Sequence, residues 1–138
     1  MHTSFESLFS WAHDAQWQNF PTSPRALGEL TGNDKSPLLT LAFETCRDIV
    51  SAIGYRRGEQ ADDALCACTA ALCALAKGKP VMALDLLAPT DIADMLHVEM
   101  DDALFYQAVL AVLCLKNALS SYADTRAADY AAFKQVQP

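Results

Sequence analysis

Residues 61–80, ADDALCACTAALCALAKGKP, decide the fold that we expect for this chain. Alanine and leucine dominate this stretch, and both residues favour the helical conformation. On a helical wheel, one face of the stretch is apolar and the opposite face carries only very small side chains. The two faces are Leu65, Cys68, Leu72, Leu75 and Ala76, and Ala67, Ala70 and Ala74. A helix that is apolar or small on all sides is typical of the centre of a closely packed domain.

The end of this stretch predicts a tight turn into a second helix. Gly78 suits the position just after a helix, because glycine readily adopts the left-handed conformation needed there. Pro80 suits the first turn of the next helix, which we expect over residues 81–88, where Pro89 stops it. Two helices joined so closely form an αα-hairpin.

Helix signals recur along the rest of the chain. Thr3 to Glu6 form a capping box, and Pro21 ends the helix that it opens. The Ser-Pro pairs at 23–24 and 36–37 each suit a helix start, so we expect one helix over 24–32 and another from 37 to Gly54 or Gly58. Further helices are expected over 90–96, 103–122 and 126–135. The sequence therefore predicts an all-α protein, a compact bundle of six or seven helices in a single domain over residues 1–138.

The hairpin resembles a tetratricopeptide-type helical hairpin. With Gly78 at the interhelical glycine, Ala71 and Ala83 occupy the positions where that motif has small residues. Ala67 and Pro80 depart from the motif, which has a large aromatic residue and a tyrosine there. The sequence DDAL at 62–65 returns at 101–104, thirty-nine residues later, and extends the resemblance over residues 60–122. The resemblance implies a concave helical face that holds a segment of a partner, as in small export chaperones and adaptors.

The charge pattern indicates what kind of partner to expect. A net charge of −7 argues against nucleic acid, which needs clustered lysine and arginine. No Lys or Arg lies between Lys79 and Lys116, although six carboxylates do. This acidic stretch is either a solvated face or a contact surface for a basic partner protein. The contact residues that we expect are Asp91, Asp94, Glu99, Asp101 and Asp102.

Two tryptophans near the N-terminus offer a second contact surface. Trp11 and Trp17 are of the residue type that anchors protein interfaces. The alternative is that they pack the first helix onto the hairpin.

The cysteines favour packing over chemistry. Five cysteines, an odd number, lie in apolar helical contexts, which is typical of a reducing compartment and predicts a cytoplasmic protein. On a helix, Cys66 and Cys73 share one side, while Cys68 points about 160° away. Three such thiols do not converge on one ion, so we expect no metal and no cofactor. The apolar run over 103–115 is too short to span a bilayer, so we expect no membrane contact.

These observations predict a binding function. We expect a cytoplasmic protein that captures another protein, as an inhibitor or immunity-type protein or as a chaperone-like adaptor. The alternatives are a self-associating structural subunit, which would form a homodimer or larger, and a small enzyme or metal-binding protein. No catalytic motif occurs, so we expect no enzyme activity.

Overall fold

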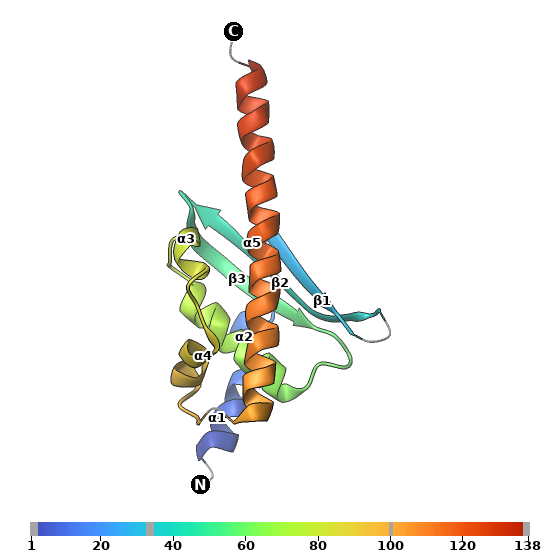
Figure 1. Ribbon diagram of the computed structural model, residues 1–138, viewed down its shortest axis with the longest axis vertical. Helices are drawn as coiled ribbons and strands as arrows, with labels where there is room; N and C mark the ends of the chain where they lie inside the picture. The colour runs from blue at the N-terminus through green and yellow to red at the C-terminus, as the bar shows by residue number, and fades with distance from the viewer. Residues whose placement is uncertain (1–2, 33–34, 100, 137–138) are drawn as a thin grey trace.

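The computed structural model describes residues 3–32, 35–99 and 101–136 and shows a mixed α/β fold (Figure 1). A three-stranded antiparallel sheet has the order β1 (Ala26–Thr31), β2 (Pro37–Cys46) and β3 (Ile49–Arg57). The long helix α5 (Asp102–Val136) lies across the sheet and projects beyond it. Helix α2 (Asp63–Ala76) packs against α5 and β3, and α1 (Thr3–Ala12) packs against α2. The expectation of an all-α bundle is therefore wrong.

The error lies in residues 24–54, where strands replace two expected helices. Three residues of β2, Leu39, Leu41 and Phe43, are fully buried and alternate along the chain, as they do in a strand with one face on a core. Arg47 and Asp48, which the expected helix crosses, have φ values of 54° and 62°. Two successive left-handed residues form the tight turn that joins β2 to β3 as a hairpin.

Helix α2 is the central helix that the sequence predicts. Asp62 caps its start, where its Oδ1 accepts a hydrogen bond from the Leu65 amide at 2.8 Å. Residues 65–73 are all buried. Gly78 has a φ of +85°, the left-handed conformation expected after the helix.

The second arm of the hairpin is not present, so the tetratricopeptide-like interpretation is also wrong. Helix α3 (Val81–Leu84) is a single turn. The chain before it runs along β3, where Val50 exchanges backbone hydrogen bonds with Gly78 (2.9 Å) and Lys79 (3.0 Å). Because these backbone groups bond to the sheet, the chain does not fold directly back along α2.

The repeated DDAL sequence marks two helix starts and no structural repeat. Asp101 caps α5 as Asp62 caps α2, and its Oδ1 accepts a hydrogen bond from the Leu104 amide at 2.7 Å. The two helices expected over 103–122 and 126–135 are one continuous helix of 35 residues. Between α3 and α5 lies α4 (Pro89–Leu96), near its expected place, and the remaining helical turn is η1 (Ala15–Trp17).

Helix α5 docks on β1 through close backbone contact. A Cβ atom on Gly28 would lie 2.2 Å from the Cys114 carbonyl oxygen, so only glycine fits there. Asn117 donates a hydrogen bond to the Glu29 carbonyl at 3.1 Å, and Ser121 accepts one from the Leu27 amide at 3.2 Å.

By length and composition α5 could cross a membrane. Its N-terminal half, however, packs into the hydrophobic core through residues such as Leu104, Leu115 and Tyr122. This is the position of a core helix, so its apolar character does not indicate a membrane span.

Candidate functional site

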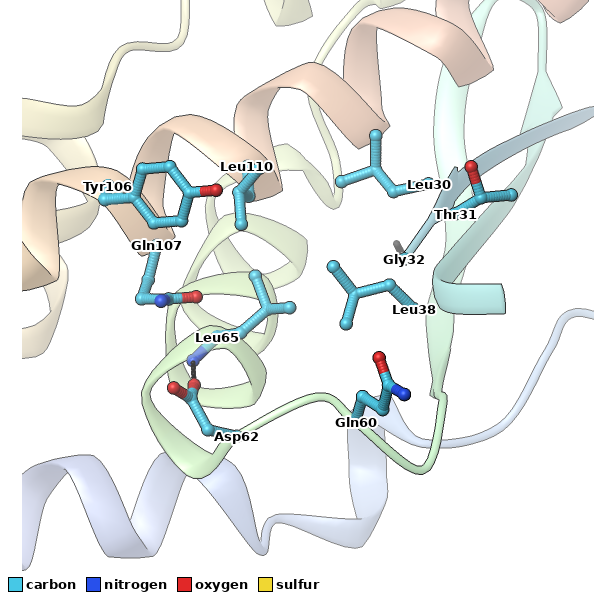
Figure 2. A pocket seen from close by; sticks show the side chains of 10 residues that line it. All are labelled: Leu30, Thr31, Gly32, Leu38, Gln60, Asp62, Leu65, Tyr106, Gln107 and Leu110. Carbon is cyan, nitrogen blue, oxygen red and sulfur yellow. Dashed lines mark hydrogen bonds between the residues drawn. The ribbon is translucent and has the colours of Figure 1, made fainter. Parts of the chain in front are cut away.

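A pocket of about 280 Å³ opens where the start of α2, the start of α5 and the end of β1 meet (Figure 2). Figure 2 shows leucine side chains facing one another in the middle of the pocket and polar side chains around them. The leucines are Leu30, Leu38, Leu65 and Leu110, and the other lining residues are Thr31, Gly32, Gln60, Asp62, Tyr106 and Gln107. We call this the polar pocket.

Secondary-structure ends position the polar groups of this pocket. Asp62 is held by its capping bond to the Leu65 amide. Tyr106 and Gln107 lie one turn into α5, just after the cap at Asp101. Gly32 follows β1, and its amide donates a hydrogen bond to the Ser36 carbonyl at 2.8 Å. The two capped helix starts therefore bring residues some forty positions apart to one rim.

The lining suits binding better than catalysis. It offers one carboxylate, two amides and two hydroxyls over an apolar floor. Of the described residues that line it, none carries a thiol, an imidazole or an amine. Such a surface can hydrogen-bond a polar group and bury an apolar one, but it does not pair a nucleophile with a base.

The cysteines lie away from this lining, and all five belong to the described part of the chain. Cys66, Cys68, Cys73 and Cys114 are buried, and only Cys46 is exposed. Burial raises the pKa of Cys68 and of Cys114 to about 12, and it also raises the pKa of Cys66 and Cys73. These four thiols stay protonated at neutral pH and fill the core, which confirms the packing role expected for them. Cys46 departs from that expectation, because it lies exposed at the end of strand β2 and not on a helix.

Two of the carboxylates expected to contact a partner stabilise helix starts. Asp101 caps α5, and Asp91 Oδ2 accepts a hydrogen bond from the Ala88 amide at 2.9 Å at the start of α4. Asp94, Glu99 and Asp102 are exposed. That these carboxylates contact a partner stays a prediction.

The two tryptophans pack in or against the hydrophobic core, whereas a side chain that anchors an interface is exposed in the free protein. Trp17 is only 7% exposed and belongs to the hydrophobic core, and Trp11 is half-buried against it. Their positions agree with the alternative role of packing the N-terminal segment onto the domain.

Sequence reasoning missed the polar pocket as a site. Its polar residues come from three separate segments, and no local motif joins them. The sequence offered one signal, the Asp-Asp pairs at 62–63 and 101–102. The first aspartate of each pair caps a helix, and these two caps flank the pocket.

Comparison with solved structures shows which known proteins share this fold. No family model matches the chain, and no curated protein matches it. Among solved structures, it is similar to the N-terminal part of a nitrogen-fixing NifU-like protein from Brucella abortus, with a TM-score of 0.52 and 12% identity over 98% of this chain and 95% of that one. It is also similar to a protein from Fervidobacterium islandicum assigned as an iron–sulfur cluster assembly scaffold of the SUF system, with a TM-score of 0.51 and 12% identity over 88% and 90%.

The chain therefore has the fold of NifU/SufU-like scaffold proteins over almost its whole length. This likeness overturns the expected function of an inhibitor, immunity protein or chaperone-like adaptor. That expectation depended on the tetratricopeptide resemblance, and the fold does not have the hairpin on which the resemblance rested.

The residues present do not fit an iron–sulfur cluster as cargo. Such clusters are held by several cysteine thiolates that surround them, commonly four. Here four of the five thiols are buried and protonated, and Cys46 stands at the exposed end of β2. Among the described residues, no group of three or more His, Cys, Asp or Glu could hold a metal ion.

Proposed function

We propose that this chain works in iron–sulfur cluster assembly as a scaffold-fold protein that does not itself hold a cluster on cysteine thiolates. The observation that carries the proposal is the burial of four of five thiols in a chain that has the scaffold fold. In this role, the protein changes how fast a loaded scaffold forms its cluster or passes it on.

The state of the thiols supports the first half of the proposal. Cys114 Sγ lies 3.4 Å from the Gly28 carbonyl, so this thiol is enclosed between α5 and β1. Cys66, Cys68 and Cys73 lie on α2 and are buried in the core. Burial raises the pKa of each thiol, which disfavours the thiolate that a metal needs. Cys46 could supply one ligand, whereas a cluster takes four.

The polar pocket supports the second half. Its amide and hydroxyl groups can bind a polar group that another assembly component presents. We therefore propose a protein partner, and we propose that the chain is no enzyme, because the pocket lining pairs no nucleophile with a base. The buried free thiols favour a reducing compartment and so a cytoplasmic protein.

The first experiment measures cluster binding directly. The purified chain is incubated without oxygen with ferrous iron, sulfide and a thiol reductant, and then desalted. We expect bound iron and acid-labile sulfide far below one cluster per chain, with the same result for Cys46→Ser. One stable cluster per chain, with its visible absorption, would show that the protein is a loaded scaffold and overturn the first half.

The second experiment measures the assembly role. The chain is added to anaerobic cluster formation on a NifU/SufU-like scaffold and to transfer from that scaffold to an apo-ferredoxin. We expect the chain to change one of these two rates, and we expect Gln107→Leu in the polar pocket to remove the effect. Leu113→Gln, an exposed position elsewhere on α5, is the matched control. If both rates are the same with and without the chain, the assembly role is wrong.

A further inference from the structure

One face of α5 repeats with the spacing of a coiled-coil seam. Leu119, Ala123, Arg126, Tyr130 and Phe133 follow one another at intervals of four and three residues. At about 100° per residue, all five lie within roughly 40° of a common line along the helix. This is the pattern of positions that face a partner helix. We call these five residues the α5 stripe.

The first part of the stripe lines a groove on the body of the protein. Leu119 and Ala123 form one wall, and Val81 and Met82 of α3 form the other. The groove has a volume of about 390 Å³ and is largely apolar, with Asp48, Asp85, Tyr122 and Arg126 also lining it. Met82 is 89% exposed, so this apolar wall faces solvent. The groove has the size and character of a site for a large apolar side chain.

The second part of the stripe has aromatic side chains and belongs to the C-terminal part of α5, which projects beyond the body (Figure 1). Tyr130 and Phe133 are 62% and 60% exposed, and every described side chain from 126 to 134 is exposed. A helical segment of this length is marginal in water when nothing packs against it. The segment therefore gains stability from any surface that covers its aromatic face.

We propose that two copies of this chain associate through their α5 stripes, antiparallel, so that Tyr130 and Phe133 of each copy enter the groove of the other. A two-fold axis beside Arg126 places Phe133 opposite Leu119 and Tyr130 opposite Tyr122 of the second copy. The paired segments span about 21 Å. The groove and the aromatic residues lie on the same face of the same helix, which is the self-complementary surface that a two-fold dimer requires.

The charges around the stripe fit this arrangement. Arg126 lies 3.5 Å from the Asp48 carboxylate and 4.0 Å from that of Asp129. Its positive charge is therefore neutralised within its own copy, so the two arginines can lie close together at the axis. Asp85, at the other end of the groove, is already paired with Lys116 of its own chain at 3.0 Å. Each charged residue that lines the groove is therefore paired within its own copy, which favours the aromatic residues of a second copy over an acidic or strongly basic partner.

The test is association measured by sedimentation equilibrium over a wide range of chain concentration. Phe133→Glu and Met82→Lys should each weaken the dimer by about thirtyfold or more, because each places a charge in the apolar contact between an aromatic residue and the groove, and the two-fold axis repeats that change. Leu113→Glu is the matched control, since Leu113 is an exposed leucine of α5 that lies outside the stripe. It should leave the dimer unchanged.

Mixing the two disruptive variants tests the arrangement itself. A mixed dimer has one unchanged contact, between the natural Met82 and Phe133, and one contact in which the introduced lysine faces the introduced glutamate. The mixture should therefore dimerise more tightly than either variant alone. A monomer at every concentration, equal effects of all three substitutions, or a mixture no tighter than its components would overturn the proposal.

Discussion

The two halves of α5 are one continuous helix in opposite environments. From Leu104 to Tyr122, one side of the helix is buried in the core, whereas from 126 to 134 every described side chain is exposed. Both halves are rich in alanine and carry large apolar residues at helical spacing. What separates them is the surface opposite: the first half faces β1, β2 and α2, and the second extends past them (Figure 1).

This difference shows that the sheet determines which part of α5 is core. Gly28 lets the helix backbone approach β1, and Asn117 and Ser121 bond to the backbone of that strand. The second half is connected to the body by surface ion pairs, Arg25 with Asp129 and Arg126 with Asp48. Changes in the first half should therefore cost much stability, and changes in the second should cost little.

The largest effect is expected at Gly28. In Gly28→Ala, the new Cβ would lie 2.2 Å from the Cys114 carbonyl and 2.5 Å from the Ala118 nitrogen, so α5 must move away from β1. We expect a loss of about 3 kcal/mol or more in the free energy of unfolding, measured by urea denaturation. Gly78→Ala is the control, because its added Cβ has open space and only its φ of +85° is unfavourable. Equal losses at both positions would contradict close docking as the cause.

A matched pair of truncations compares the two halves directly. Leu115 is fully buried, and Leu115→Ala should cost about 3 kcal/mol in the free energy of unfolding. Phe133 is 60% exposed, and Phe133→Ala should cost less than about 0.5 kcal/mol when the chain is monomeric. Both are measured by denaturation at a low chain concentration. A larger loss at Phe133 than at Leu115 would show that the second half is packed in the monomer.

The buried thiols predict how stability depends on pH. The pKa of Cys68 and of Cys114 rises from 9.0 to about 12 on folding, because burial disfavours the thiolate. Between pH 9 and 12 the unfolded chain therefore releases protons that the folded chain retains. The stabilisation is complete below pH 9 and falls by up to about 1.4 kcal/mol per pH unit for each thiol as the pH rises to 12.

Two measurements check this prediction. The free energy of unfolding should decline steadily above pH 9, and Cys114→Ala should make the decline less steep. At neutral pH, a thiol reagent should modify Cys46 rapidly and the four buried cysteines only on unfolding. Rapid modification of all five cysteines in the folded protein would contradict the burial of the thiols.

The helices could be predicted from the sequence where their signals are local. Asp62, Gly78 and Asp101 mark helix ends by hydrogen bonding or backbone conformation that depends on a few neighbouring residues. The packing role of the cysteines in α2 followed from their place on an apolar helix in the same way.

The strands could not be predicted by periodicity alone. Residues 38–53 contain apolar side chains at spacings that suit a helix and also alternate at Leu39, Leu41 and Phe43. The turn at Arg47 and Asp48 decides between the two, but neither residue is the glycine or asparagine that usually signals it. The polar pocket depends on this sheet, so it could not be predicted without it.

The smallest effect is expected at one of the ion pairs between the second half of α5 and the body, that of Arg25 with Asp129. Arg25 and Asp129 are both partly exposed, and water and salt weaken such a pair. Asp129→Asn should lower the free energy of unfolding by less than about 1 kcal/mol, and added salt should remove the difference.

Because this ion pair joins the second half of α5 to the strand side of the domain, hydrogen exchange of amides 126–134 in Asp129→Asn is the more sensitive measurement. Faster exchange there, with unchanged exchange in 104–122, would show that the two halves of α5 open independently, whereas equal acceleration in both would show that they open as one unit.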